Sequence, residues 1–143
     1  MLFSEKREDL RRQYVEAWRK AREGTPMTAL EDLIAGVVHE HPEYQALLEN
    51  EDALGRDWTP EQGETNPFLH MGMHIAVREQ VSTNRPPGIR EAFDALVRRR
   101  GDTHAAEHDM LECLGESLWE AQRAGRAPDE AAYLGKVRQR ARS

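Results

Sequence analysis

The chain has 143 residues, which is long enough to bury a hydrophobic core, and we expect one domain over residues 1–143. A net charge of -6 and a pI near 5.5 argue against a nucleic-acid partner. The single cysteine excludes an internal disulfide and a cysteine-based zinc knuckle. No apolar run reaches the roughly 18 residues of a membrane span. The N-terminus also lacks the apolar region of a signal peptide, so we expect a cytoplasmic protein that does not contact a membrane.

Three helices are predicted in the first third of the chain. Apolar residues recur at helical spacing over residues 4–22, 29–41 and 43–49. Thr28 and Glu31 have the spacing of a capping box, in which each side chain satisfies a backbone amide of the other residue. The second helix is therefore expected to begin directly after Thr28.

The two histidines near residue 40 are predicted to face different ways. His41 follows Val37 and Val38 by four and three residues, so it shares their buried face. His39 falls on the opposite face and is expected to contact water. Of this pair, His41 is the candidate for a functional role.

A loop is predicted over residues 50–65, with Trp58 anchoring it to the body of the protein. Asn66 and Pro67 then form a helix start signal, because asparagine caps well and proline suits the first helical position. The helix predicted over 67–82 is apolar nearly all round, which indicates a central position in the fold.

Three further helices are predicted in the last third: 89–100, 103–124, and a last one from Ala127-Pro128-Asp129 to about residue 140. The buried stripe of the helix over 103–124 is expected at Leu111, Leu114 and Leu118. No segment alternates like a strand. The predicted fold is an all-α, single-domain bundle of five to six helices.

All six histidines of the chain occur in closely spaced pairs. The pairs are His39 with His41, His70 with His74, and His104 with His108. The last two pairs have a four-residue spacing, which places two side chains one above the other on a helix. Two such rings can converge on one ion.

These patterns predict a divalent metal site between helices, holding one or two ions. Neutral imidazoles with nearby carboxylates suit zinc, iron or manganese, and helical bundles commonly build such sites from facing helices. The candidate ligands are His70, His74, His104, His108, Glu107, Glu112 and His41.

Two alternatives compete with this interpretation. In a metal-free network, Glu107 and Glu112 would accept hydrogen bonds from histidine rings or pair with Arg78, and the protein would be a structural or interaction module. His104-x-x-Glu107-His108 also matches an inverted zincin motif, which would make the protein a metal-dependent hydrolase. The chain supplies no clear third zinc ligand downstream, so the hydrolase is the weaker alternative.

Several stretches together resemble a proteobacterial family catalogued as domain of unknown function 1841. The stretches are His41-Pro42-Glu43-Tyr44, Asn66-Pro67-Phe68-Leu69-His70 with His74, Arg85-Pro86-Pro87-Gly88-Ile89, and His104-Ala105-Ala106-Glu107-His108 through Glu116. The resemblance covers nearly the whole chain and implies a small cytoplasmic bacterial protein. It brings no activity, and the sequence indicates no protein partner beyond a possible homodimer.

Overall fold

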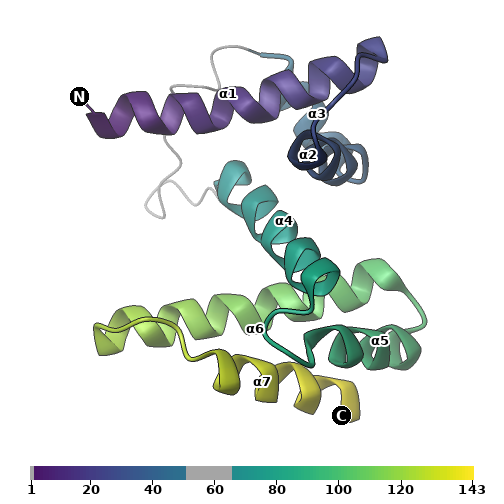
Figure 1. The fold of residues 1–143 in the computed structure, drawn as a ribbon, viewed down its shortest axis with the longest axis vertical. Coiled ribbons are helices and arrows are strands. Elements are labelled where there is room, and N and C mark those ends of the chain that lie inside the picture. Colours follow the sequence, from purple (N-terminus) through teal and green to yellow (C-terminus); the bar gives the residue numbers. More distant parts are fainter. Residues whose placement is uncertain (1, 51–65) are drawn as a thin grey trace. The chain divides into compact units, whose positions relative to one another are not determined.

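The structure, a computed structural model, describes residues 2–50 and 66–143 (Figure 1). Within these ranges it contains seven α-helices and no strand, so the all-α prediction is confirmed. The predicted count of five to six was too low, because each segment with a helical pattern, including the short one after Pro42, forms a separate helix. The predicted anchor Trp58 lies outside the described residues. The helices are α1 (Leu2–Glu23), α2 (Ala29–His39), α3 (Pro42–Leu48), α4 (Pro67–Thr83), α5 (Ile89–Arg100), α6 (Thr103–Ala124) and α7 (Glu130–Arg142).

The helix starts follow the capping residues. At the start of α2, Thr28 Oγ1 accepts from the Glu31 amide at 3.2 Å, and Glu31 Oε1 accepts from the Thr28 amide at 2.9 Å. This confirms the predicted capping box. At the start of α4, Asn66 Oδ1 accepts from the amides of Phe68 and Leu69. Both caps supply acceptors for amides that have no partner within their own helix.

The second helix ends earlier than predicted, at His39 rather than residue 41. His41 instead occupies the cap position of α3, with φ −128° and ψ 80°. The reason is Pro42, whose ring disfavours helical backbone angles in the residue before it. The chain therefore bends at His41, and its imidazole projects from a junction between two helices.

The described helices form two compact units that divide within α4, between Ile75 and Ala76. In the first unit, α1 packs against α2 and α3, and the first half of α4 completes the core. The prediction of a single domain stays a prediction. The core of the first unit consists of Ala17, Trp18, Ile34, Val37, Val38, Leu48, Phe68, Met71 and Ile75.

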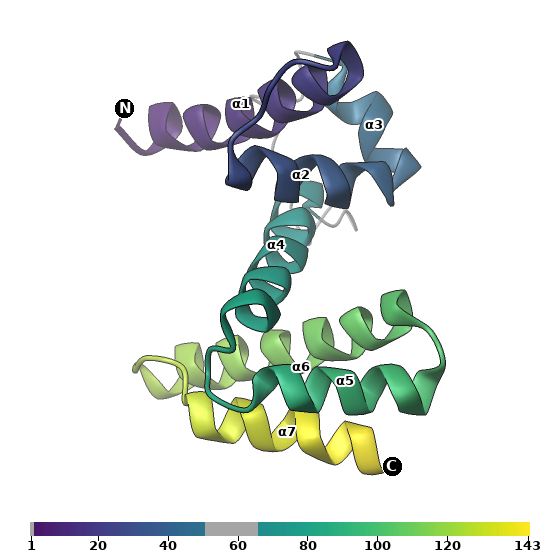
Figure 2. The same cartoon turned by 45° about the vertical axis from the view of Figure 1, so that its right-hand side comes forward.

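In the second unit, α5, α6 and α7 pack side by side (Figures 1 and 2). The predicted buried stripe of α6 is confirmed only in part: Leu111 is buried and Leu114 half-buried, but Leu118 is 43% exposed. Apolar residues lie on several faces of α6. The face with the smaller side chains is the one that allows the neighbouring helices to approach closely. The buried face of α6 runs through Ala106, Met110, Cys113, Ser117 and Ala121.

None of the helices in the described ranges is long and apolar enough to span a membrane.

Candidate metal centre

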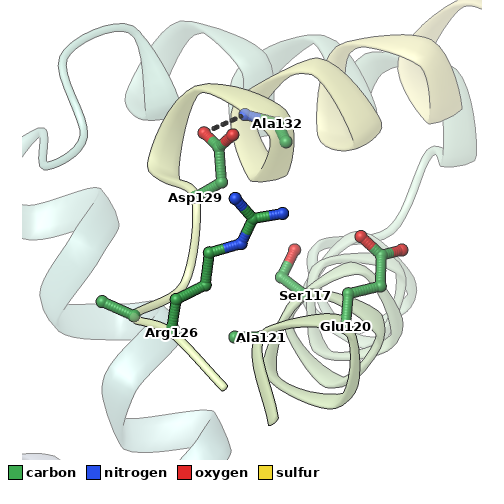
Figure 3. Close-up of a pocket in the computed structure, with 7 residues that line it drawn as sticks. Ser117, Glu120, Ala121, Arg126, Asp129 and Ala132 are labelled. Atoms are coloured by element: carbon green, nitrogen blue, oxygen red, sulfur yellow. Dashed lines mark hydrogen bonds between the residues drawn. The ribbon is translucent and has the colours of Figure 1, made fainter. Parts of the chain in front are cut away.

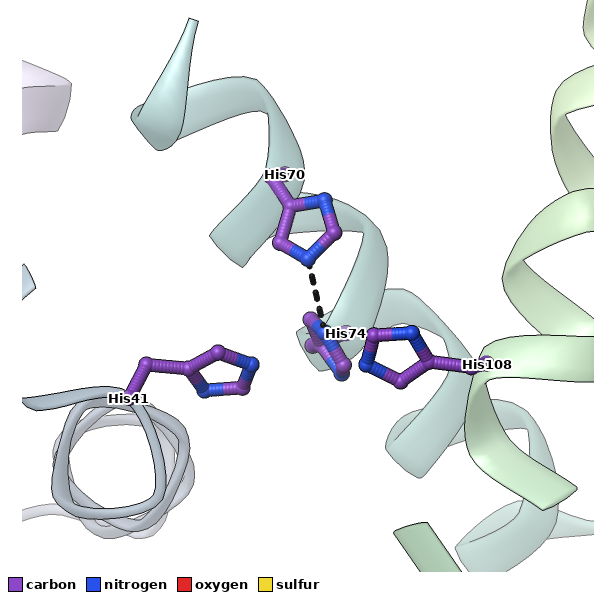
Figure 4. Close-up of side chains that lie close together, drawn as sticks. All are labelled: His41, His70, His74 and His108. Carbon is purple, nitrogen blue, oxygen red and sulfur yellow. Dashed lines mark hydrogen bonds between the residues drawn. The ribbon is translucent and has the colours of Figure 1, made fainter. Parts of the chain in front are cut away.

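Three histidines of the first unit gather around one point (Figure 4). His41 projects from the junction of α2 and α3, and His70 and His74 project from α4. One ring nitrogen of each lies within 4.8 Å of the others. His74 is 0% exposed and His41 is 5% exposed, whereas His70 is half-buried. The burial predicted for His41 from its helical register is confirmed.

His70 and His74 are one helical turn apart, so their rings lie one above the other on α4. Their Nε2 atoms are 3.1 Å apart, and one of these nitrogens donates a hydrogen bond to the other. In a tetrahedral zinc site with bonds of about 2.0–2.1 Å, two ligand nitrogens lie about 3.3 Å apart. The helix thus holds the two nitrogens at nearly the separation that adjacent ligands of one ion require.

The His41 ring is oriented by a backbone hydrogen bond. Its Nδ1 lies 2.7 Å from the carbonyl oxygen of Val37, which is one helical turn earlier. Because a carbonyl oxygen only accepts, Nδ1 carries the proton, and in the neutral ring the lone pair is on Nε2. A hydrogen bond of this kind from the second ring nitrogen is typical of histidines that ligate metals.

Tyr44 belongs to this cluster and was not predicted from the sequence. Its ring stacks on His41 with centroids 5.2 Å apart, and it lies 6.0 Å from the His70 ring. Burial, with a smaller contribution from the charge of Glu43, raises the pKa of the Tyr44 phenol. The phenol therefore stays neutral and covers one side of the histidines. The signal in the sequence was its position three residues after His41.

The second four-residue pair lies on α6, in the second unit. The rings of His104 and His108 are 4.5 Å apart, as their helical spacing predicts. His104 is exposed and His108 is half-buried. The role of this pair as metal ligands stays a prediction.

Glu107 forms a buried ion pair with an arginine. Arg78 Nε lies 3.2 Å from both oxygens of the Glu107 carboxylate, within the second unit. A metal ligand or general base at Glu107 would have to compete with this charge-assisted interaction. The alternative in which Arg78 pairs with this glutamate agrees with the observed contact.

Glu112 faces α7 and is exposed. Its carboxylate accepts a hydrogen bond from Arg140, and Arg140 also contacts Asp109, to which Arg100 binds at 2.6 Å. The hydrogen bond with Glu112 is the main cause of the raised pKa of Arg140. This predicted ligand therefore takes part in an ion-pair network between α6 and its two neighbours.

These features define an all-helical protein with a cluster of buried histidines. The chain belongs to the DUF1841 family, a domain of unknown function, which it matches over residues 6–139. The resemblance seen in the sequence motifs is thereby confirmed. No curated protein and no solved structure matches the chain.

Proposed function

We propose that this protein binds a divalent metal ion through His41, His70 and His74. The observation that carries the proposal is the convergence of their ring nitrogens within 4.8 Å. Placing imidazoles in a buried position costs free energy unless their polar atoms find partners. A metal ion would supply one partner to all three rings at once.

The donor set favours zinc or iron over manganese. Imidazole nitrogen suits zinc and iron, whereas manganese prefers carboxylate and water oxygens. The carboxylates of Glu107 and Glu112 interact with arginines, so imidazoles make up the ligand set that we propose. Zinc is our first choice.

A tetrahedral ion held by these three histidines keeps one further position. Four protein ligands make a closed tetrahedral site, which is typical of a structural metal. A water molecule in the fourth position would instead make a catalytic site of the kind that metal-dependent hydrolases use.

The proposal is tested with His41→Gln and His74→Gln, and with His39→Gln as the matched control. His39 is exposed at the end of α2 and lies outside the cluster. For each protein, the thermal midpoint is measured with and without added zinc, and bound zinc is measured by elemental analysis. We expect a near-stoichiometric ion and a thermal shift for the wild type and for His39→Gln only. Equal zinc binding by all four proteins would contradict the proposal.

A metal-free histidine network is the second candidate, and the hydrogen bond between His70 and His74 favours it. Such a network would fix the α4 surface without any ion. It predicts that His74→Gln lowers the thermal midpoint, while zinc and chelators leave the wild type unchanged.

A further inference from the structure

A surface pocket of about 200 Å³ lies in the second unit, where α6 ends and α7 begins (Figure 3). Its charged lining residues Glu120, Arg126 and Asp129 are exposed. The Ser117 hydroxyl is closed off from solvent, so a ligand in the pocket does not reach it. Among the described residues, the buried contacts around His41 make a better-built site than this pocket.

The backbone of α3 places the aromatic ring of Tyr44 beside the histidine cluster. Pro42 occupies the first position of this helix, and the chain bends at His41 directly before it. The Tyr44 amide then donates a hydrogen bond to the carbonyl oxygen of His41 at 2.9 Å, which closes the first turn of α3. Because side chains three residues apart in a helical turn are neighbours, the two rings lie against each other.

Two contacts fix the orientation of the His41 ring. Its Nδ1 donates a hydrogen bond to the carbonyl oxygen of Val37 at 2.7 Å, which holds one edge of the ring but still allows the ring to tilt. The Tyr44 ring opposes that tilt, because it lies nearly parallel to the imidazole, at 18° and with the centroids 5.2 Å apart. The opposite edge of the His41 ring, which carries Nε2, points toward His74 (Figure 4). The centroids of these two histidine rings are 4.5 Å apart.

We propose that Tyr44 is a positioning residue of the metal site, whose ring holds the His41 imidazole in the orientation that ligates the ion. This inference rests on the proposed function. A ligand that is oriented before the ion arrives loses less conformational freedom on binding, which raises the affinity. Replacing a residue that orients a metal ligand typically weakens metal binding by about 10–100-fold. The face of the Tyr44 ring makes the contact, so the phenol oxygen is not required for it.

The test compares zinc binding by the wild type, Tyr44→Phe and Tyr44→Leu. The zinc affinity is measured by competition with a chromophoric chelator, and the thermal midpoint without zinc reports folding. We expect Tyr44→Phe to bind zinc as tightly as the wild type, because phenylalanine keeps the stacked ring. Tyr44→Leu should bind zinc about tenfold more weakly, because leucine has no flat face to hold the imidazole.

Leu47→Ala is the matched control, because Leu47 lies on the same short helix and packs against the core of the first unit. It should lower the thermal midpoint and leave the zinc affinity unchanged. The positioning role is overturned, while the metal site stands, if Tyr44→Leu binds zinc as tightly as the wild type. It is also overturned if Tyr44→Phe or Leu47→Ala loses as much affinity as Tyr44→Leu. A wild type that binds no zinc overturns both this inference and the proposed function.

Discussion

The ion pair between Arg78 and Glu107 determines the role of the glutamate in the protein. The glutamate is buried on α6, and Arg78 contacts both of its oxygens from the end of α4 that belongs to the same unit. The charge of the carboxylate is stabilised by the guanidinium within a partly dry environment. Glu107 therefore links α6 to the end of α4 through this ion pair.

We expect Arg78→Met to lower the free energy of unfolding by about 2–3 kcal/mol, because it leaves the charge of a buried carboxylate without this ion pair. The double variant Arg78→Met with Glu107→Leu should recover most of that loss, since it removes both charges. Urea unfolding of the two variants and the wild type measures the effect. If the single variant is as stable as the wild type, the ion pair does not stabilise the fold.

At the residue scale, helical register predicted the direction of His41 and the stacking of the two four-residue pairs. It did not predict the contact of Tyr44 with His41, because that contact depends on the bend before Pro42. It also did not predict the pocket at Ser117, since the pocket forms only where α6 and α7 meet. The spacing of residues in the sequence identifies which side chains are neighbours on one helix. It does not identify which side chains of different helices come into contact.

At the scale of the elements, the N-terminus of α2 also forms a contact with α1. Besides its capping contact with Thr28, Glu31 accepts a hydrogen bond from Lys20 Nζ of α1 at 2.8 Å. The hydrogen bond from Lys20, followed by that from the Thr28 amide, lowers the pKa of Glu31 from its usual 4.5. Ionised Glu31 thus joins two helices of the first unit.

This lowered pKa predicts a specific pH dependence. A depressed pKa in the folded state contributes stability that is present above the unfolded value and is lost as the pH falls through the folded value. The stability difference between the wild type and Glu31→Gln should therefore be fully present above pH 4.5 and shrink below it. Chemical denaturation at a series of pH values measures it. A difference that does not change with pH would contradict the assigned ion pair.

Replacement by alanine of two glycines in the second unit should change the stability of the protein in opposite directions. Gly135 lies within α7 with open space around it, so Gly135→Ala should stabilise the protein by about 0.5–1 kcal/mol. Gly125 ends α6 with φ +66°, where a Cβ is strained, so Gly125→Ala should destabilise it by about 1–2 kcal/mol. Thermal unfolding compares the two variants, and a shift of the same sign in both would contradict this account of the α6 terminus.

Most helix boundaries could be predicted at the scale of the elements, because capping residues, prolines and glycines act locally. The range 103–124 of α6 agrees with the prediction, whereas its buried face agrees only in part, since Leu111 is buried as predicted. Leu118 was expected inside and is exposed, because burial is decided by the helices that pack nearby. The hydrophobic pattern of one helix cannot identify those neighbours.

For the whole molecule, the prediction of an all-α fold and the family resemblance are both confirmed. The division of the helices into two units could not be predicted, since it falls inside one continuous helix with no glycine or proline at the division between Ile75 and Ala76. The histidines of α4 lie on the first side of that division, in the same unit as His41. This places three of the predicted ligands in one compact part of the chain.

The most direct test of the account is the metal content of untagged protein, purified without a nickel column or a chelator. Elemental analysis should find a near-stoichiometric amount of zinc or iron, and removal of that ion should lower the thermal midpoint. Protein without bound metal, with no thermal shift after zinc, iron or manganese is added, would contradict the central claim. The three histidines would then form a hydrogen-bonded core.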